Sequence, residues 1–161
     1  MITTLAALLI LALQHPSMPA GMSHEEHQKQ MQKDAELKRR GDAAMGFDQD
    51  KTVHRFRTSA SGGSIEVEVK DAADTVSLAQ VRAHLEEIAA AFTNGDFASP
   101  MQTHAEVPPG VPVMERLKSE IVYSYAPTAK GGAVKIQTTN KEALAAIHEF
   151  LQYQTREHHT R

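Results

Sequence analysis

Two stretches of the chain show the same order of features, and this internal repeat limits the possible folds more than any other property of the sequence. Each stretch begins with two strand patterns and continues with an amphipathic helix pattern. The pair Gly62-Gly63 in the first stretch corresponds to Gly131-Gly132 in the second. The apolar helix positions also correspond, after a slightly shorter link from strand to helix: Leu78, Val81 and Leu85 match Leu144, Ile147 and Leu151. The sequence therefore predicts two ββα units.

The local patterns of each unit support this interpretation. Ile65, Val67 and Val69 alternate with charged residues, as in a strand with one buried and one solvated face. Each glycine pair is expected at a hairpin turn, and Asn140 is expected to cap the second helix. Two hairpins and two helices predict an α+β fold, in which a four-stranded antiparallel sheet carries both helices on one face.

The N-terminal segment differs in composition from the repeats. Leu5 to Leu13 form an unbroken apolar run of nine residues, which is too short to span a bilayer, since a spanning helix needs about 20. The run is typical of a secretory signal, although no Lys or Arg precedes it; a buried helix or strand is the alternative. We predict a signal peptide over residues 1–21, a polar helical or disordered arm over 22–44, and the duplicated domain over 45–161. The protein is then periplasmic or secreted, without a membrane span after signal cleavage.

Charge and residue content restrict the partners. The net charge is -3 and no basic stripe is present, so nucleic acid is not an expected partner. The 161 residues include no cysteine, which excludes disulfides and thiolate metal sites, but they include seven methionines and nine histidines. Thioether favours Cu(I), and imidazole also binds copper. We therefore predict a copper-binding protein.

The segment Pro100 to Met114 is the centre of the candidate site. It contains four prolines and has neither a helical nor a strand period, which predicts a rigid, irregular loop between the two units. His54 has the same strand parity as Phe56 and is expected to face the core beside this loop. The alternative is that the methionines fill the core and the histidines cap polar edges. The predicted metal ligands are Met45, His54, Met101, His104 and Met114.

Other histidines lie outside this set. His24, His27 and Met31 are spaced i, i+3 and i+7, on one helical face of the arm, and are predicted accessory metal ligands. Solvated side chains are the alternative for this arm. The histidines on or after the second helix are expected to be structural or solvated: His148, His158 and His159.

Two other functions stay open. One is an interaction or sensor module that binds another exported protein through the Pro-rich loop. The other is a small hydrolase with a histidine as general base, paired with a carboxylate. The chain has no G-x-S-x-G elbow, Gly-rich phosphate loop or H-E-x-x-H motif, so a non-catalytic protein is expected. The conceivable base pairs are His104 with Glu106 and His54 with Asp48 or Asp50.

The chain contains the segments AMGFDQDKTVHRF, GGSIEVEVKDAADT, PPGVPVMERLKSEIVYSY and ALAAIHEFLQYQTREH. Together these segments resemble a family of small exported bacterial domains of uncharacterised function, with the pattern M-G-F-x-Q-x-K-T-x-H-x-F. The resemblance covers Met45 to His158 and implies export, but no activity. In that family the first strand often reads T-x-H-H-F, whereas this chain has Arg55 at the second histidine position. A ligand scheme with two histidines on this strand is therefore weakened.

Overall fold

The computed structural model describes residues 22–158. The predicted signal peptide and His159 lie outside the described residues. The chain divides into two compact units, Met1–Lys33 and Asp34–Arg161. In the first unit, the described residues include the start of helix α1 (His24–Met45). Ser23 caps this helix: its hydroxyl accepts a hydrogen bond from the N–H of Glu26 (3.2 Å), whose carboxylate accepts one from the N–H of Ser23 (2.9 Å).

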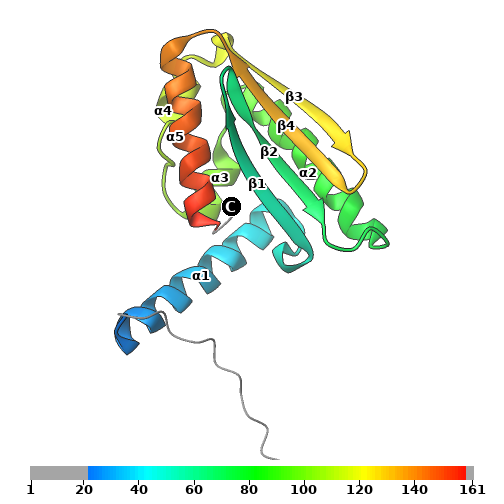
Figure 1. Cartoon of the computed structure of the whole chain (residues 1–161), viewed down its shortest axis with the longest axis vertical. Helices are drawn as coiled ribbons and strands as arrows, with labels where there is room; N and C mark the ends of the chain where they lie inside the picture. Colours follow the sequence, from blue (N-terminus) through cyan, green and yellow to red (C-terminus); the bar gives the residue numbers. More distant parts are fainter. Residues whose placement is uncertain (1–21, 159–161) are drawn as a thin grey trace, which may run out of the picture. The chain divides into compact units, whose positions relative to one another are not determined.

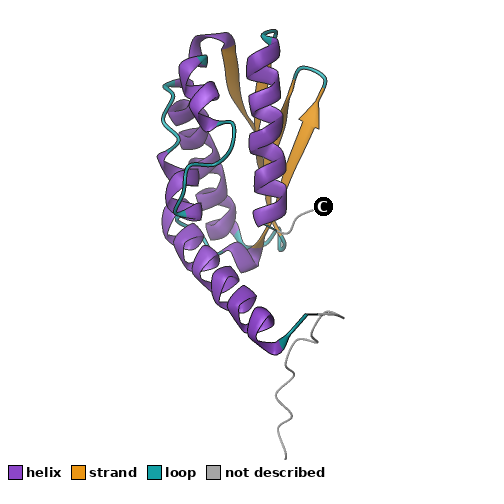
Figure 2. Cartoon of the chain, turned by 90° about the vertical axis from the view of Figure 1, so that its left-hand side faces the viewer, coloured by secondary structure: helices purple, strands orange, loops and turns teal. Residues whose placement is uncertain are grey.

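The second unit contains a four-stranded antiparallel sheet, which confirms the predicted α+β fold (Figure 1). The strands are β1 (Thr52–Ser59), β2 (Gly62–Val69), β3 (Ile121–Thr128) and β4 (Gly131–Thr138), in the order β1-β2-β4-β3. The two long helices, α2 (Thr75–Thr93) and α5 (Lys141–Glu157), cover one face of the sheet (Figure 2). Each helix packs mainly on the hairpin of the other repeat: α2 on β3 and β4, and α5 on β1 and β2.

The two repeats meet at the centre of the sheet, where β2 pairs with β4. Ile65 lies opposite Val134 in this pair, and the two residues are equivalent, since each is the fourth residue of its strand. The outer strands β1 and β3 correspond in the same way, so an approximate two-fold axis passes between Ile65 and Val134. The internal repeat predicted from the sequence therefore organises the whole sheet.

The glycine pairs have a different role from the predicted one. The turns are Ala60-Ser61 and Ala129-Lys130, and the glycines begin the following strands. A Cβ on Gly62 would lie 1.9 Å from the backbone oxygen of Ile136, and a Cβ on Gly131 would lie 1.9 Å from that of Val67. Glycine is therefore needed because the backbones of β2 and β4 approach closely at both ends of their pairing.

The segment from Pro100 to Met114 is not the irregular loop that we predicted. It contains most of two short helices, α3 (Ala98–His104) and α4 (Val111–Arg116). Pro100 and Pro112 lie in the first turns of these helices, where the backbone N–H has no intrahelical acceptor and proline is tolerated. These prolines therefore start helices, and only the stretch between the helices, with Pro108 and Pro109, is a loop.

The compact unit begins before Met45, where the sequence suggested its boundary. Leu37 on α1 is buried, and the side chain of Arg40 donates a hydrogen bond to the backbone oxygen of Thr103 on α3 (3.0 Å). Asp42 accepts hydrogen bonds from the backbone N–H (3.0 Å) and side-chain amide (3.2 Å) of Gln49. These contacts fix the turn that leads from α1 through Met45 into β1.

Apolar residues of the sheet and of both long helices form one core. Val81, Leu85, Ile88 and Phe92 of α2 are buried, as the predicted helical stripe requires. Asn140 caps α5, since its side-chain oxygen accepts from the N–H groups of Glu142 (2.8 Å) and Ala143 (3.1 Å). Across residues 22–158, no helix is both long and apolar enough to cross a membrane.

Candidate functional site

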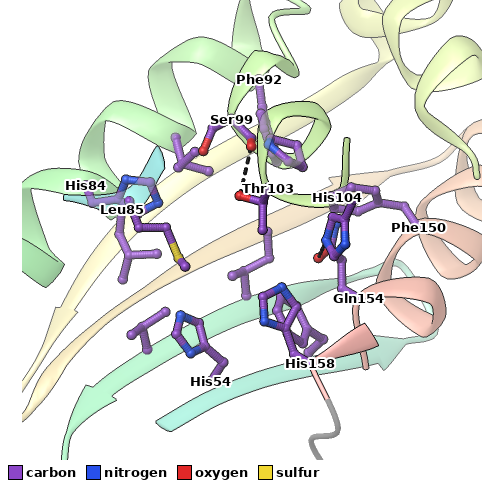
Figure 3. A pocket seen from close by; sticks show the side chains of 16 residues that line it. His54, His84, Leu85, Phe92, Ser99, Thr103, His104, Phe150, Gln154 and His158 are labelled. Atoms are coloured by element: carbon purple, nitrogen blue, oxygen red, sulfur yellow. Dashed lines mark hydrogen bonds between the residues drawn. The ribbon is translucent and has the colours of Figure 1, made fainter. Parts of the chain in front are cut away.

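A cavity of about 60 Å³ lies between the first hairpin and the surrounding helices (Figure 3). Its walls are mostly apolar, but four imidazoles and one thioether also line it. Strand β1, helix α2, helix α3 and the end of α5 each contribute one histidine, and the end of α1 contributes the methionine. These residues are His54, His84, His104, His158 and Met45.

His54 lies on β1 and faces the core, as its strand parity predicted. Its side chain is only 8% exposed, and its ring stacks on that of His158 with centroids 5.5 Å apart. Its Nε2 atom is buried and has no hydrogen-bond partner. Burial, with a smaller contribution from His84, lowers the pKa of His54 to about 4. The ring is therefore neutral at pH 7 and keeps a nitrogen lone pair.

His104 is the last residue of α3 and is also buried. Its Nε2 lies 2.9 Å from the side-chain oxygen of Gln154 on α5, while its Nδ1 is buried without a partner. The ring contacts His158 edge to face, with centroids 5.3 Å apart. Burial lowers the pKa of His104, so this ring is neutral as well.

His84 and His158 were not among the predicted site residues. His84 is half-buried on α2, contacts the ring of Phe47 (5.6 Å), and has a pKa lowered to about 4 by burial. His158 follows α5 and lies between the rings of His54 and His104, as Figure 3 shows. The expectation that His158 is merely structural or solvated overlooked its position at the cavity.

A signal for the missed histidines is present in the repeat itself. His54 and Tyr123 are each the third residue of their strands, and the helices align through Leu85 and Leu151. The pair His54–His158 thus corresponds to the pair Tyr123–Phe92, whose centroids are 5.7 Å apart. One repeat therefore has imidazoles at positions where the other has carbocyclic aromatic rings. The three correspondences are His54 with Tyr123, His158 with Phe92, and His84 with Phe150.

The structure separates the five predicted ligands into two groups. Met45, His54 and His104 line the cavity. Met101 is partly buried against the core, and Met114 on α4 is 0% exposed within it, and neither lines the cavity. The helical form of the Pro-rich segment places Met114 on α4, apart from Met101 and His104 on α3. Met101 is one helical turn from His104, but of the two only His104 lines the cavity. Of the five predicted ligands, the candidate site at the cavity therefore includes Met45, His54 and His104 but not Met101 or Met114.

The predicted accessory ligands lie in the other compact unit, and they are described separately. His24, His27 and Met31 are on the first turns of α1, on one helical face, as their spacing predicted. His24 is exposed, and Met31 is 47% exposed. These side chains are open to solvent, which suits either ion capture or simple solvation.

The histidine–carboxylate pairs considered for a hydrolase have other contacts in the structure. Glu106 accepts a hydrogen bond from the hydroxyl of Tyr153, while His104 bonds to Gln154. Asp48 and Asp50 both contact the ammonium of Lys38 (3.3 and 3.4 Å). In the structure, the groups of the three conceivable general-base pairs therefore contact other partners.

Metal ligation by histidine and carboxylate alone does not fit the arrangement. Among residues 22–158, no group of three or more His, Cys, Asp or Glu side chains is placed to hold one ion. Two imidazoles on one ion have ring centroids roughly 5–6.5 Å apart, given metal–nitrogen distances of about 2.0–2.1 Å. The centroid separations of His54 from His158 (5.5 Å) and of His104 from His158 (5.3 Å) fall in that range. The stacked rings of His54 and His158 must turn, however, to direct their nitrogens at one ion. A site here therefore needs a thioether together with imidazoles.

Comparisons with known proteins give no match: no family model, no curated protein and no solved structure is similar to this chain. The function must therefore be argued from the cavity itself.

Proposed function

We propose that the chain is an exported, non-catalytic protein that binds Cu(I) in the histidine-lined cavity. Met45, His54 and His104 are the proposed ligands, and His158 is an additional imidazole within reach of both histidines. The observation that carries this proposal is a pair of buried nitrogens, His54 Nε2 and His104 Nδ1, which line the same cavity and have no hydrogen-bond partner.

Leaving such atoms unpaired is costly. A buried polar group without a partner costs about 1–3 kcal/mol, so native proteins rarely keep one without a reason. An ion bound by both rings would give each of these nitrogens a partner. A buried water is the simpler occupant, because a water molecule also needs two or more polar partners. The two occupants are distinguished by measuring metal affinity.

The chemistry of the donors favours copper in its reduced state. Neutral imidazoles and a thioether add no negative charge to the site, and thioether is a ligand that selects Cu(I). The lowered pKa of His54 keeps its nitrogen available for metal well below neutral pH. Calcium and magnesium prefer oxygen ligands, which the cavity offers mainly as neutral hydroxyl and amide groups.

The sequence adds support for export. The apolar run Leu5–Leu13 is typical of a secretory signal, and the chain has no cysteine. Met and His are copper ligands that do not form disulfides outside the reducing cytosol. His24, His27 and Met31 on α1 are proposed to collect the ion as an accessory group.

Competition against a chromophoric Cu(I) chelator, under anaerobic and reducing conditions, tests the proposal. The full chain is used, with His24, His27 and Met31 replaced by Ala so that only the cavity is measured. We expect His54→Ala with His104→Ala to weaken Cu(I) binding by more than about 100-fold, beyond the roughly 10–100-fold typical for loss of an outer-shell partner.

His148→Ala is the matched control. His148 lies on α5 but outside the cavity, where its Nε2 contacts the backbone oxygens of Ser59 (2.9 Å) and Gly62 (3.1 Å). This variant removes one imidazole and leaves the proposed ligands in place, so Cu(I) affinity should stay the same. Unchanged affinity in a folded double variant, checked by circular dichroism, would refute the proposed function.

A further inference from the structure

Gln154 is an unusual residue for its position. It is 3% exposed on the buried face of α5, at the position that corresponds to Ile88 in the first repeat. Burying an amide costs free energy unless the amide is hydrogen-bonded. The repeat shows that an aliphatic side chain is compatible with this place in the fold. The amide therefore calls for an explanation other than packing.

The amide contacts one of the two histidines with an unpaired nitrogen. The side-chain oxygen of Gln154 lies 2.9 Å from His104 Nε2. A carbonyl oxygen only accepts hydrogen bonds, so with the amide in this orientation Nε2 carries the proton, while the side-chain nitrogen of Gln154 is buried without a partner. A neutral imidazole has one N–H, which leaves the lone pair on Nδ1, the buried atom without a partner.

Neighbouring contacts hold the ring in this orientation. His104 meets the ring of Tyr153 edge to face, with centroids 5.0 Å apart. The hydroxyl of Tyr153 donates to Glu106, which follows shortly after His104 in the chain. Between them, Ala105 adopts a left-handed conformation with φ of 57°, which ends α3. Two hydrogen bonds therefore join the end of α3 to α5: one between His104 and Gln154, and one between Glu106 and Tyr153.

We propose that Gln154 is a positioning residue that fixes His104 as its Nε2–H tautomer and so presents Nδ1 to the cavity as the ligand atom. Metal-binding histidines generally donate their second ring N–H to a carboxylate or carbonyl, which sets the tautomer and raises ligand basicity. The identity of the ion rests on the function proposed above, whereas the tautomer is a property of the metal-free protein.

Long-range ¹H–¹⁵N NMR of the histidine rings in the metal-free full chain tests the tautomer. We expect a protonated Nε2 and an unprotonated Nδ1 for His104, and a shift of the Nδ1 resonance when Cu(I) is added. In Gln154→Ile, which copies the other repeat, the tautomer preference should be lost and Cu(I) affinity should fall by about 10–100-fold. Gln154→Glu keeps an oxygen acceptor and should retain the tautomer.

The possible outcomes separate the two proposals. A protonated Nδ1 in the wild-type protein, or an unchanged tautomer and affinity in Gln154→Ile, would overturn the role of Gln154. If the wild-type chain binds no Cu(I), the proposed function fails, and the tautomer of the metal-free protein still decides the role of Gln154. The backbone amide NMR spectrum of each variant shows whether it folds. If Gln154→Ile does not fold, the tautomer of His104 in Gln154→Glu is used to test the proposal.

Discussion

The two repeats share a backbone plan but differ in what lies between an edge strand and the helix that covers it. Between β3 and α2, the rings of Phe92, Phe97 and Tyr123 pack closely, with the first two stacked at 4.3 Å. Between β1 and α5, the corresponding space holds His54 and His158 and borders a cavity of about 60 Å³. One side of the molecule is a filled aromatic core, and the other holds a mostly apolar cavity lined by several imidazoles in the same fold.

This difference shows which residues the fold does not require. Aromatic residues at the equivalent positions make a dense core, so the imidazoles are not needed to build a ββα unit. His54 leaves its buried Nε2 without a partner, which lowers stability. Proteins commonly depart from the best local packing at functional sites. The asymmetry between the repeats therefore marks this cavity as the candidate site independently of any metal chemistry.

Exchanging side chains between equivalent positions of the two repeats should have the largest effect on the free energy of unfolding. Phe92→His places an imidazole among the aromatic rings of the other side. We expect the free energy of unfolding to fall by an amount that approaches about 3–5 kcal/mol, the cost of truncating a buried Phe. The reverse change, His158→Phe, affects a half-buried ring and should alter stability by less than about 1 kcal/mol. Urea denaturation of both variants measures the contrast. Equal losses in the two variants would mean that the two sides do not differ.

Glycine substitutions test where the repeats agree. Gly131→Ala and Gly62→Ala both drive a Cβ into a backbone oxygen of the partner strand, and each should cost about 1–3 kcal/mol. Gly62 also has a φ of +147°, which should make Gly62→Ala the more costly by about 1 kcal/mol or more. Thermal unfolding of the two variants checks both statements. A neutral result at either position would contradict the close approach of β2 and β4.

Between about pH 6.5 and 4, the buried histidines should dominate the pH dependence of stability. In the unfolded chain His54 and His84 titrate near the ordinary pKa of about 6.5, whereas in the folded chain both pKa values are lowered to about 4. Between these values the unfolded chain binds protons that the folded chain does not. Unfolding free energy should therefore fall as pH drops from about 6.5 to 4, by up to about 1.4 kcal/mol per pH unit for each imidazole.

His54→Phe should remove one imidazole from this slope. Its matched control is Tyr123→Phe at the equivalent position, which should leave the slope unchanged because burial raises the pKa of the Tyr123 phenol still further from this window. Denaturant unfolding of metal-free protein from pH 7 to pH 4.5 measures both variants. The assignment fails if His54→Phe has the same pH dependence as the wild-type chain.

Periodicity is sufficient to predict the framework of the domain. Strands and helices that are buried on one face have a regular apolar pattern in the sequence. This pattern is visible in the alternation of Ile65, Val67 and Val69 and in the apolar stripe of α2. The glycine pairs lie next to equivalent hairpin turns, but their close approach to a strand of the other repeat is something that no local pattern reveals. The helical role of Pro100 is hidden because proline in the first turn leaves little periodic pattern in a helix of seven residues.

The site is only partly predictable for a related reason. The core-facing position of His54 follows from strand parity, which is a local property. The position of Met114 in the core, away from the cavity, could not be predicted, because a methionine in the core and a methionine at a ligand site look alike in sequence. His84 and His158 escape a motif search, although aligning the repeats sets them against Phe150 and Phe92. Comparison within the chain carries information that composition and motif searches do not.

The crossing of the helices over the sheet has a consequence for how the chain reaches its native state. Since α2 packs mainly on β3 and β4, and α5 mainly on β1 and β2, each ββα unit covers only part of its own hairpin. A single unit would therefore expose apolar surface on its hairpin and on its helix together. Much of the stability therefore depends on contacts between residues that are distant in the sequence, such as Ile65 and Val134. Such non-local contacts slow folding, because local structure formed early is not yet stabilised by them. A free-standing ancestor of one unit would have needed a second copy of itself, with the helices exchanged between the two chains.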